Sequence, residues 1–182
     1  MERLTSARIG ATFNFYRDGR GAGTRRERLL AYLRAFSDAP LLLVGEAAGH
    51  RGARVSGIPF TSERQLTGHG PAEATATIVR RVLAELGLED EALCWNVVPT
   101  HPHLPGRPAT NRRPTRSEVE DAALFLRELA SGRRVVAVGR LAHAVLGDPY
   151  VRHPSHGGAA EFRRGLLAFR PGGQRVRHFS VT

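Results

Sequence analysis

Four side chains with useful chemistry lie in or near short loops that follow apolar, strand-like segments. The segments GEAAG, CWNVVPTHP and HPSHGG contain a carboxylate at Glu46, an amide at Asn96 and an imidazole at His153, and SGIPFTSER adds the aromatic ring of Phe60. In an open α/β sheet, ligands bind at the loops that leave the carboxyl ends of the strands. We therefore expect these side chains to converge on one cleft.

The last of these segments also offers an anion site. Ser155, His156 and Gly157 come just before a predicted closing helix over residues 159–167. Backbone amides at the N-terminus of a helix point outward and bind negatively charged groups. We expect this turn to contact phosphate or to enter the groove of a nucleic acid.

The elements that must hold these loops alternate between strand and helix. Continuous apolar runs typical of buried parallel strands cover residues 41–44, 93–98, 135–138 and 150–152. Helical spacing covers residues 24–36, 73–86, 115–129, 141–146 and 159–167, and Thr115 with Glu118 forms a capping box. This order predicts an α/β fold, a three-layer α/β/α sandwich with a short central parallel sheet.

The ends of the chain and one internal segment are less regular. Residues 1–23 are rich in Gly and Arg and are expected either to pack over the domain or to reach a partner as a flexible arm. Residues 100–114 are rich in Pro and Arg and are expected to be irregular, and the basic tail after Pro171 is expected to be an edge strand or mobile. No linker divides the chain, so we expect one domain over residues 1–182.

The charge of the chain points to an anionic partner. The 182 residues carry a formal net charge of +10, and every one of the 27 basic residues is Arg. Codon bias in a high-GC genome explains the choice of Arg over Lys but not the excess over 17 acidic residues. A domain this basic is expected to meet nucleic acid, an anionic membrane surface or an acidic protein.

Other classes of site are disfavoured. Cys94 is the single cysteine and lies in an apolar run, so we expect it to be a core residue and expect neither a disulfide nor an iron–sulfur cluster. The eight histidines lack the helical spacing of a zinc pair, so no metal and no cofactor are expected. No apolar run is long enough to span a bilayer and no secretory signal is visible, so we expect a cytoplasmic protein.

Taken in order, the motifs resemble the uracil-DNA glycosylase superfamily. The loop GEAAG with SGIPF resembles its first motif, and CWNVVPTHP followed by NRRPT resembles its second landmark. The strand and helix that precede the family's last motif resemble VVAVGRLAHAVLG, and the last motif itself, an HPS loop, resembles HPSHGG. The resemblance runs from about residue 41 to residue 167. The resemblance implies the α/β/α fold of that family and hydrolysis of a base from DNA.

The resemblance also implies roles for the pocket residues. Phe60 matches the ring on which a flipped base stacks, and Asn96 matches the amide that reads the edge of a pyrimidine. His153 matches the histidine that donates to the oxygen of the departing base. The alternatives are a core aromatic for Phe60, an amide bonded to nearby backbone for Asn96 and an ordinary loop histidine for His153.

The first motif departs from the most familiar branch of the family. That branch has Asp at the position of Ala47, which we place among the base-binding residues. Glu46 matches the Glu of the iron–sulfur-bearing branch and is our candidate to support the sugar cation or the water; alternatively it is structural, with His50 and Glu63 as replacements. Ala48 also replaces the usual Pro, so this chain resembles a small, cluster-free member.

A set of polar and basic residues around these motifs is predicted to bind DNA phosphates. Its members are His50, Ser62, Arg64, Arg112, Arg113, Ser155, His156 and Gly157. Further arginines at positions 51, 54, 107, 116 and 152 flank the same segments, although each one alone is better explained as a solvated side chain.

The function predicted from these features is removal of uracil from DNA by a monomeric, base-flipping glycosylase. Release of another deaminated base, hypoxanthine or xanthine, is one alternative, since Ala47 alters the first motif. A non-catalytic protein that binds damaged DNA is a second, and an unrelated nucleotide-binding α/β protein is a third.

Overall fold

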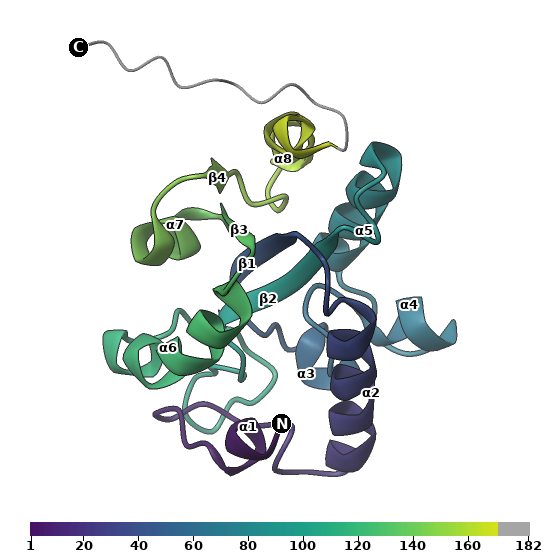
Figure 1. Ribbon diagram of the computed structural model, residues 1–182. Coiled ribbons are helices and arrows are strands. Elements are labelled where there is room, and N and C mark those ends of the chain that lie inside the picture. Colours follow the sequence, from purple (N-terminus) through teal and green to yellow (C-terminus); the bar gives the residue numbers. More distant parts are fainter. Residues whose placement is uncertain (171–182) are drawn as a thin grey trace, which may run out of the picture.

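A four-stranded parallel sheet lies at the centre of the computed structural model, which describes residues 1–170 (Figure 1). The strand order is β2-β1-β3-β4, and the strands are β1 (Leu41–Ala47), β2 (Ala92–Val98), β3 (Arg134–Val138) and β4 (Tyr150–Val151). All the pairings are parallel, with Gly45 beside Asn96 and Leu43 beside both Cys94 and Val136. The carboxyl ends of the strands therefore share one edge of the sheet.

Helices cover both faces of this sheet. The larger helices are α2 (Ala22–Ala35), α5 (Ala74–Leu86), α6 (Arg116–Ala130), α7 (Arg140–Leu146) and α8 (Ala159–Leu166). Short helices α1 (Glu2–Ser6), α3 (Ala53–Ser56) and α4 (Glu63–Thr67) and a single 3₁₀ turn, η1 (Leu167–Phe169), complete the described chain.

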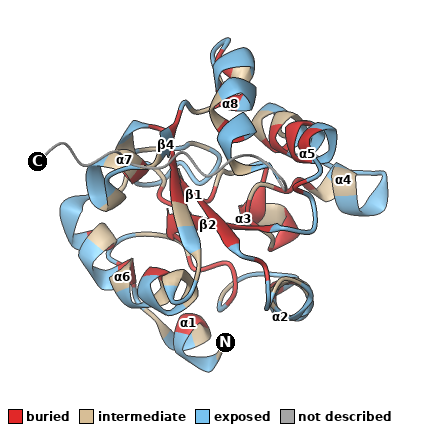
Figure 2. Cartoon of the chain, turned by 45° about the horizontal axis from the view of Figure 1, so that its top comes forward, coloured by how far each residue is buried: buried red, intermediate tan, exposed pale blue. Residues whose placement is uncertain are grey.

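The alternation of side chains along the strands divides the core into two layers. Leu42 and Val44 pack with apolar residues of α2, α6 and α7, whereas Leu41 and Leu43 pack with those of α5 and α8. Figure 2 shows the buried residues along β1 and β2 and the exposed outer faces of the helices. The predicted α/β/α sandwich is therefore confirmed.

Local signals explain where the main helices begin and end. Helix α6 begins with the expected capping box, in which Thr115 Oγ1 accepts from the backbone of Glu118 at 3.2 Å and the Glu118 carboxylate accepts from the backbone of Thr115 at 2.9 Å. Helix α5 ends at Gly87, which has the positive φ of 65° that favours glycine.

The N-terminal segment packs over the domain, which is one of the two alternatives for residues 1–23 and not the flexible arm. Phe15 and Tyr16 are fully buried, and the Tyr16 hydroxyl donates to the carbonyl of Gly57 at 2.9 Å. Phe13 forms an isolated antiparallel bridge with His101. The segment thus supports two of the loops predicted to form the site, while the basic tail beyond Pro171 lies outside the described residues.

Candidate active site at the carboxyl edge of the sheet

A cavity of about 490 Å³ opens at the carboxyl edge of the sheet, a volume typical of small-molecule sites. The loops after β1 and β2, the start of α7 and the loop after β4 surround it. The predicted residues that line it are Glu46, Ala47, Phe60, Asn96, Arg112, Arg113, His153, Ser155 and His156. The convergence expected from the positions of these motifs in the sequence is therefore present in the fold.

Phe60 and Asn96 meet above Gly45. A Cβ at Gly45 would lie 2.9 Å from Phe60 Cε2, closer still to Cζ, and 3.0 Å from Asn96 Oδ1. Because Gly45 pairs with Asn96 across the two central strands, the missing side chain leaves room for the ring to lie beside the amide. Phe60 adopts a φ of 51°, a left-handed conformation that costs energy in a non-glycine residue and often marks a functional site.

Asn96 as a residue is about 5% exposed, and its side-chain amide makes no hydrogen bond with any residue in the described part of the chain. The amide lines the cavity instead. The alternative in which Asn96 bonds nearby backbone is therefore not what the structure shows. Both its donor and its acceptor remain available to a ligand in the cavity.

His153 is held in one tautomer by its own loop. Its Nδ1 accepts a hydrogen bond from the backbone amide of Ser155 at 3.2 Å and lies 2.8 Å from the Ser155 hydroxyl. A neutral imidazole whose Nδ1 accepts carries its proton on Nε2. Burial lowers the pKa of His153, and proximity to His156 lowers it further, so the ring is a neutral donor at pH 7.

The loop geometry around His153 depends on two glycines. Gly139, at the end of β3, has a φ of 91°, and a Cβ there would lie 3.2 Å from His153 Cβ. A Cβ at Gly158 would collide with Arg152 Nε at 2.7 Å and with the backbone of the same turn. Close backbone approach thus positions the imidazole at the cavity.

Glu46 lies at the end of β1, which extends three residues beyond the predicted strand and ends at Ala47. Its carboxyl group is partly buried, and burial raises its pKa while the Arg113 guanidinium opposes that rise. Arg113 is exposed and lines the same cavity. The first motif therefore brings a partly buried carboxyl group to the cavity, and the NRRPT stretch brings a guanidinium that favours its ionised form.

Some of the residues predicted to bind DNA instead hold the fold together. Ser62 is fully buried and caps α4 through a reciprocal capping box with Gln65, so its hydroxyl does not face the cavity. Arg112 makes a two-pronged ion pair with Glu118, with a 2.6 Å contact, although part of its side chain still lines the cavity. Arg64 is exposed and donates to the carbonyl of Gly70, outside the cavity lining.

The first and second motifs are joined by hydrogen bonds that the sequence did not reveal. The backbone amide of His50 donates to Asn111 Oδ1 at 3.0 Å, and His101 Nδ1 donates to the carbonyl of Ala48 at 2.8 Å. Asn111, which belongs to the NRRPT stretch, lines the cavity. Glu73 and Arg140 line it too, and the sequence did not predict any of these three as site residues. Glu73 precedes α5 without any motif around it, so only the fold brings it to the site.

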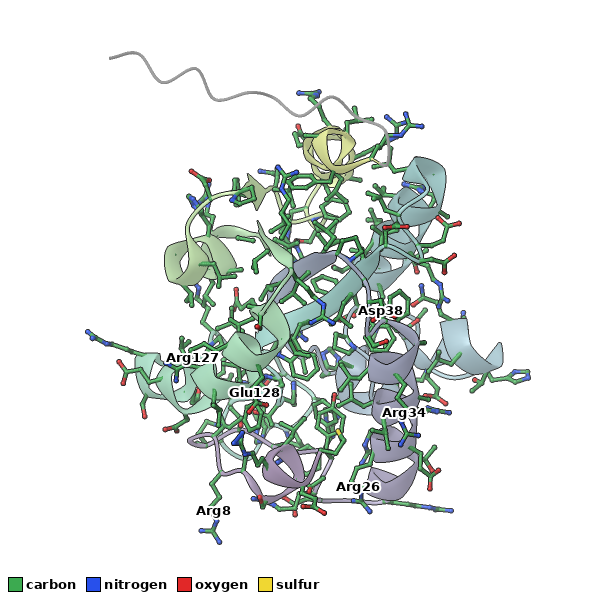
Figure 3. All side chains as sticks on the ribbon, in the orientation of Figure 1. Arg8, Arg26, Arg34, Asp38, Arg127 and Glu128 are labelled. Atoms are coloured by element: carbon green, nitrogen blue, oxygen red, sulfur yellow. The ribbon has the colours of Figure 1, made fainter. Side chains whose placement is uncertain are left out.

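The arginines are spread over several faces of the molecule and are not gathered at the cavity. Figure 3 shows Arg8 pointing away from the body, Arg26 and Arg34 on α2, and Arg127 on α6. All four are exposed, and none lines the cavity. At the cavity itself the basic side chains are Arg112, Arg113 and Arg140.

The described residues hold no group of three or more His, Cys, Asp or Glu side chains arranged to bind a metal ion. Cys94 is buried in the core, as expected, and burial raises the pKa of its thiol to about 12. None of the helices within residues 1–170 is long and apolar enough to cross a membrane.

The sequence model of the Uracil DNA glycosylase superfamily matches residues 33–173, which is most of the chain and includes every loop of this cavity. The chain belongs to the uracil DNA glycosylase superfamily. No curated protein matches it. Among solved structures, wild-type SMUG2 of Pedobacter heparinus is similar, with a TM-score of 0.65 and 13% identity over 92% of this chain and 93% of that one. At 13% identity, the similarity to this structure shows a shared fold only. Membership of the superfamily indicates that the chain is a DNA glycosylase.

Proposed function

We propose that this member of the superfamily removes uracil from DNA by hydrolysing the N-glycosidic bond of a flipped nucleotide. The observation that supports this most is the side-chain amide of Asn96, which lines the cavity, has no partner among the described residues and lies beside the ring of Phe60. A planar ring next to an available amide is suited to a flat heterocycle with polar groups on its edge.

The amide matches the edge of uracil. Uracil presents a carbonyl oxygen next to an N–H, and Asn96 offers an NH₂ donor next to a carbonyl acceptor. Phe60, held in its strained backbone conformation over Gly45, supplies the stacking surface. These contacts offset the few kcal/mol that flipping the nucleotide costs.

His153 and Glu46 complete the proposed mechanism. As the bond breaks, negative charge develops on the base and positive charge on the sugar. The Nε2–H of neutral His153 stabilises the base oxygen, a kind of contact whose loss typically costs about 3–4 kcal/mol. The Glu46 carboxylate, whose ionised form the Arg113 guanidinium favours, stabilises the sugar cation.

Basic and polar groups at the rim would hold the DNA backbone. Arg113 and Arg140 line the cavity, and Ser155, His156 and Gly157 form the turn before α8. We propose that His50 and Arg64 make outer phosphate contacts, and that Arg112 and Ser62 act by supporting their loops. We also propose that the protein acts as a monomer.

The test is a strand-cleavage assay on labelled oligonucleotides that contain uracil, hypoxanthine or xanthine. Alkali reveals abasic sites, and both single strands and mismatched duplexes are used. Cleavage at uracil supports the proposal. Cleavage at only hypoxanthine or xanthine moves the substrate to another deaminated base, and salt-sensitive DNA binding without any cleavage indicates a non-catalytic protein.

A further inference from the structure

A second carboxyl group, that of Glu73, faces the same cavity from the residue before α5. It packs against the loop of the first motif at two glycines. A Cβ at Gly52 would lie 2.7 Å from Glu73 Cδ, and one at Gly49 would lie 3.4 Å from that atom and closer to an oxygen. The glycines of this loop therefore make room for the carboxyl group.

The surroundings of Glu73 differ from those of the other acidic residues nearby. Within the described part of the chain its carboxyl oxygens make no hydrogen bond or ion pair, and burial raises its pKa without any opposing cation. Glu46, in contrast, has Arg113 to favour its ionised form. The two carboxyl groups at the cavity therefore differ in their surroundings, since a guanidinium opposes the effect of burial at Glu46 and none does at Glu73.

From this arrangement we propose that Glu73 is the general base that activates the attacking water, while Glu46 stabilises the sugar cation. This inference rests on the proposed glycosylase function. In the step, the C1′–N bond breaks and its electron pair leaves with the base. The water oxygen bonds to C1′, and the water proton passes to the Glu73 carboxylate.

The two other candidates for this role are worse placed. Glu63 is engaged with Arg28 in an ion pair at 2.7 Å and does not line the cavity. His50 also lies outside the cavity lining, and its backbone is tied to Asn111. Glu73 combines access to the cavity with a carboxyl group that no donor within residues 1–170 occupies.

The test compares single-turnover base release by the wild type and by Glu73→Gln across a range of pH. The amide keeps the shape of the side chain, and general-base catalysis typically contributes about 10²–10⁴-fold, so a loss of that size is expected near neutral pH. Protonated Glu73 is as inactive as glutamine, so the ratio of the two rates should fall toward one as the pH is lowered. Glu161→Gln, on the exposed face of α8, is the matched control and should keep the wild-type rate.

Other titratable and charged groups around the cavity are present in both proteins and cancel in this ratio. They are Glu46, Arg112, Arg113, Arg140, His153 and His156. Glu73→Asp, which keeps the charge but shortens the side chain, should be slow yet retain the wild-type pH dependence. This second variant distinguishes loss of the general base, the Glu73 carboxylate, from loss of packing in the loop.

Equal rates for Glu73→Gln and the wild type would overturn the inference. A slower Glu73→Gln whose ratio to the wild type stays constant with pH would also overturn it, because such a loss reflects loop position alone. If the wild type releases no base from any oligonucleotide, the proposed function itself fails, and that result is distinct from either of these.

Discussion

Replacement of Gly45 with Ala should disable base release while leaving the protein folded and bound to DNA. The new methyl group would lie 2.9 Å from Phe60 Cε2, closer still to Cζ, and 3.0 Å from Asn96 Oδ1. Comfortable carbon–carbon contacts are about 3.5–4.0 Å, so the ring must move by roughly 1 Å. Its backbone is already in a strained left-handed conformation, which limits how the residue can accommodate the shift.

The size of the effect follows from that displacement. A misplacement of about 1 Å costs about 10²-fold in rate, and loss of base stacking costs about 1–3 kcal/mol. Overpacking of this kind lowers the free energy of unfolding by about 1–3 kcal/mol. The phosphate contacts at the rim are unchanged, so the dissociation constant for the intact oligonucleotide should change little.

The assay is single-turnover release of the base that the wild type removes fastest, with DNA binding measured by fluorescence anisotropy and folding by thermal melting. Gly23→Ala is the matched control, because a Cβ there meets nothing nearer than 3.8 Å. A folded Gly45→Ala protein with wild-type activity would refute the placement of the base between Phe60 and Asn96.

Three further substitutions test the leaving-group donor, a buried ion pair and a buried histidine. His153→Ala should slow base release by about 10²–10³-fold at unchanged DNA affinity, since it removes one donor to the leaving group; an unchanged rate would exclude that role. Arg112→Ala leaves the Glu118 carboxylate buried without its guanidinium and should lower the free energy of unfolding by about 3 kcal/mol in denaturant titrations. Burial lowers the pKa of His101, so the folded protein resists its protonation. Its contribution to the free energy of unfolding is complete above about pH 6.5, the pKa of an unfolded histidine. As the pH falls toward the pKa of His101 in the folded protein, this contribution is lost by at most about 1.4 kcal/mol per pH unit. His101→Gln should show a shallower acid loss in melts, and an identical slope would contradict this reasoning.

The sequence predicted the sheet and its main helices because apolar runs and helical spacing carry a strong signal. The strands at 93–98 and 135–138 and the capping box at Thr115 agree with the structure to within a residue or two. The short helices α1, α3 and α4 were missed, since helices of four or five residues bury too little to produce a periodic pattern.

The candidate site was predicted in part. Residues that stand in strand-to-loop motifs, such as Phe60, Asn96 and His153, were found because the order of parallel strands fixes where their loops meet. Glu73 was missed because it is 27 residues from Glu46 in sequence and belongs to no motif. Ser62 carries the same kind of hydroxyl as a phosphate-binding serine, and only its burial at the start of α4 reveals a capping role.

The most direct test of the central claim is the release of free uracil from a uracil-containing oligonucleotide, compared between the wild type and Asn96→Ala. The released base is identified by mass spectrometry under single-turnover conditions, at enzyme concentrations that saturate the DNA. We expect free uracil from the wild type and at least about a 10²-fold slower release from Asn96→Ala, at similar DNA affinity, because the variant lacks the amide that faces the cavity. Equal release by the two proteins would contradict this expectation, since the amide would then play no part in holding the base.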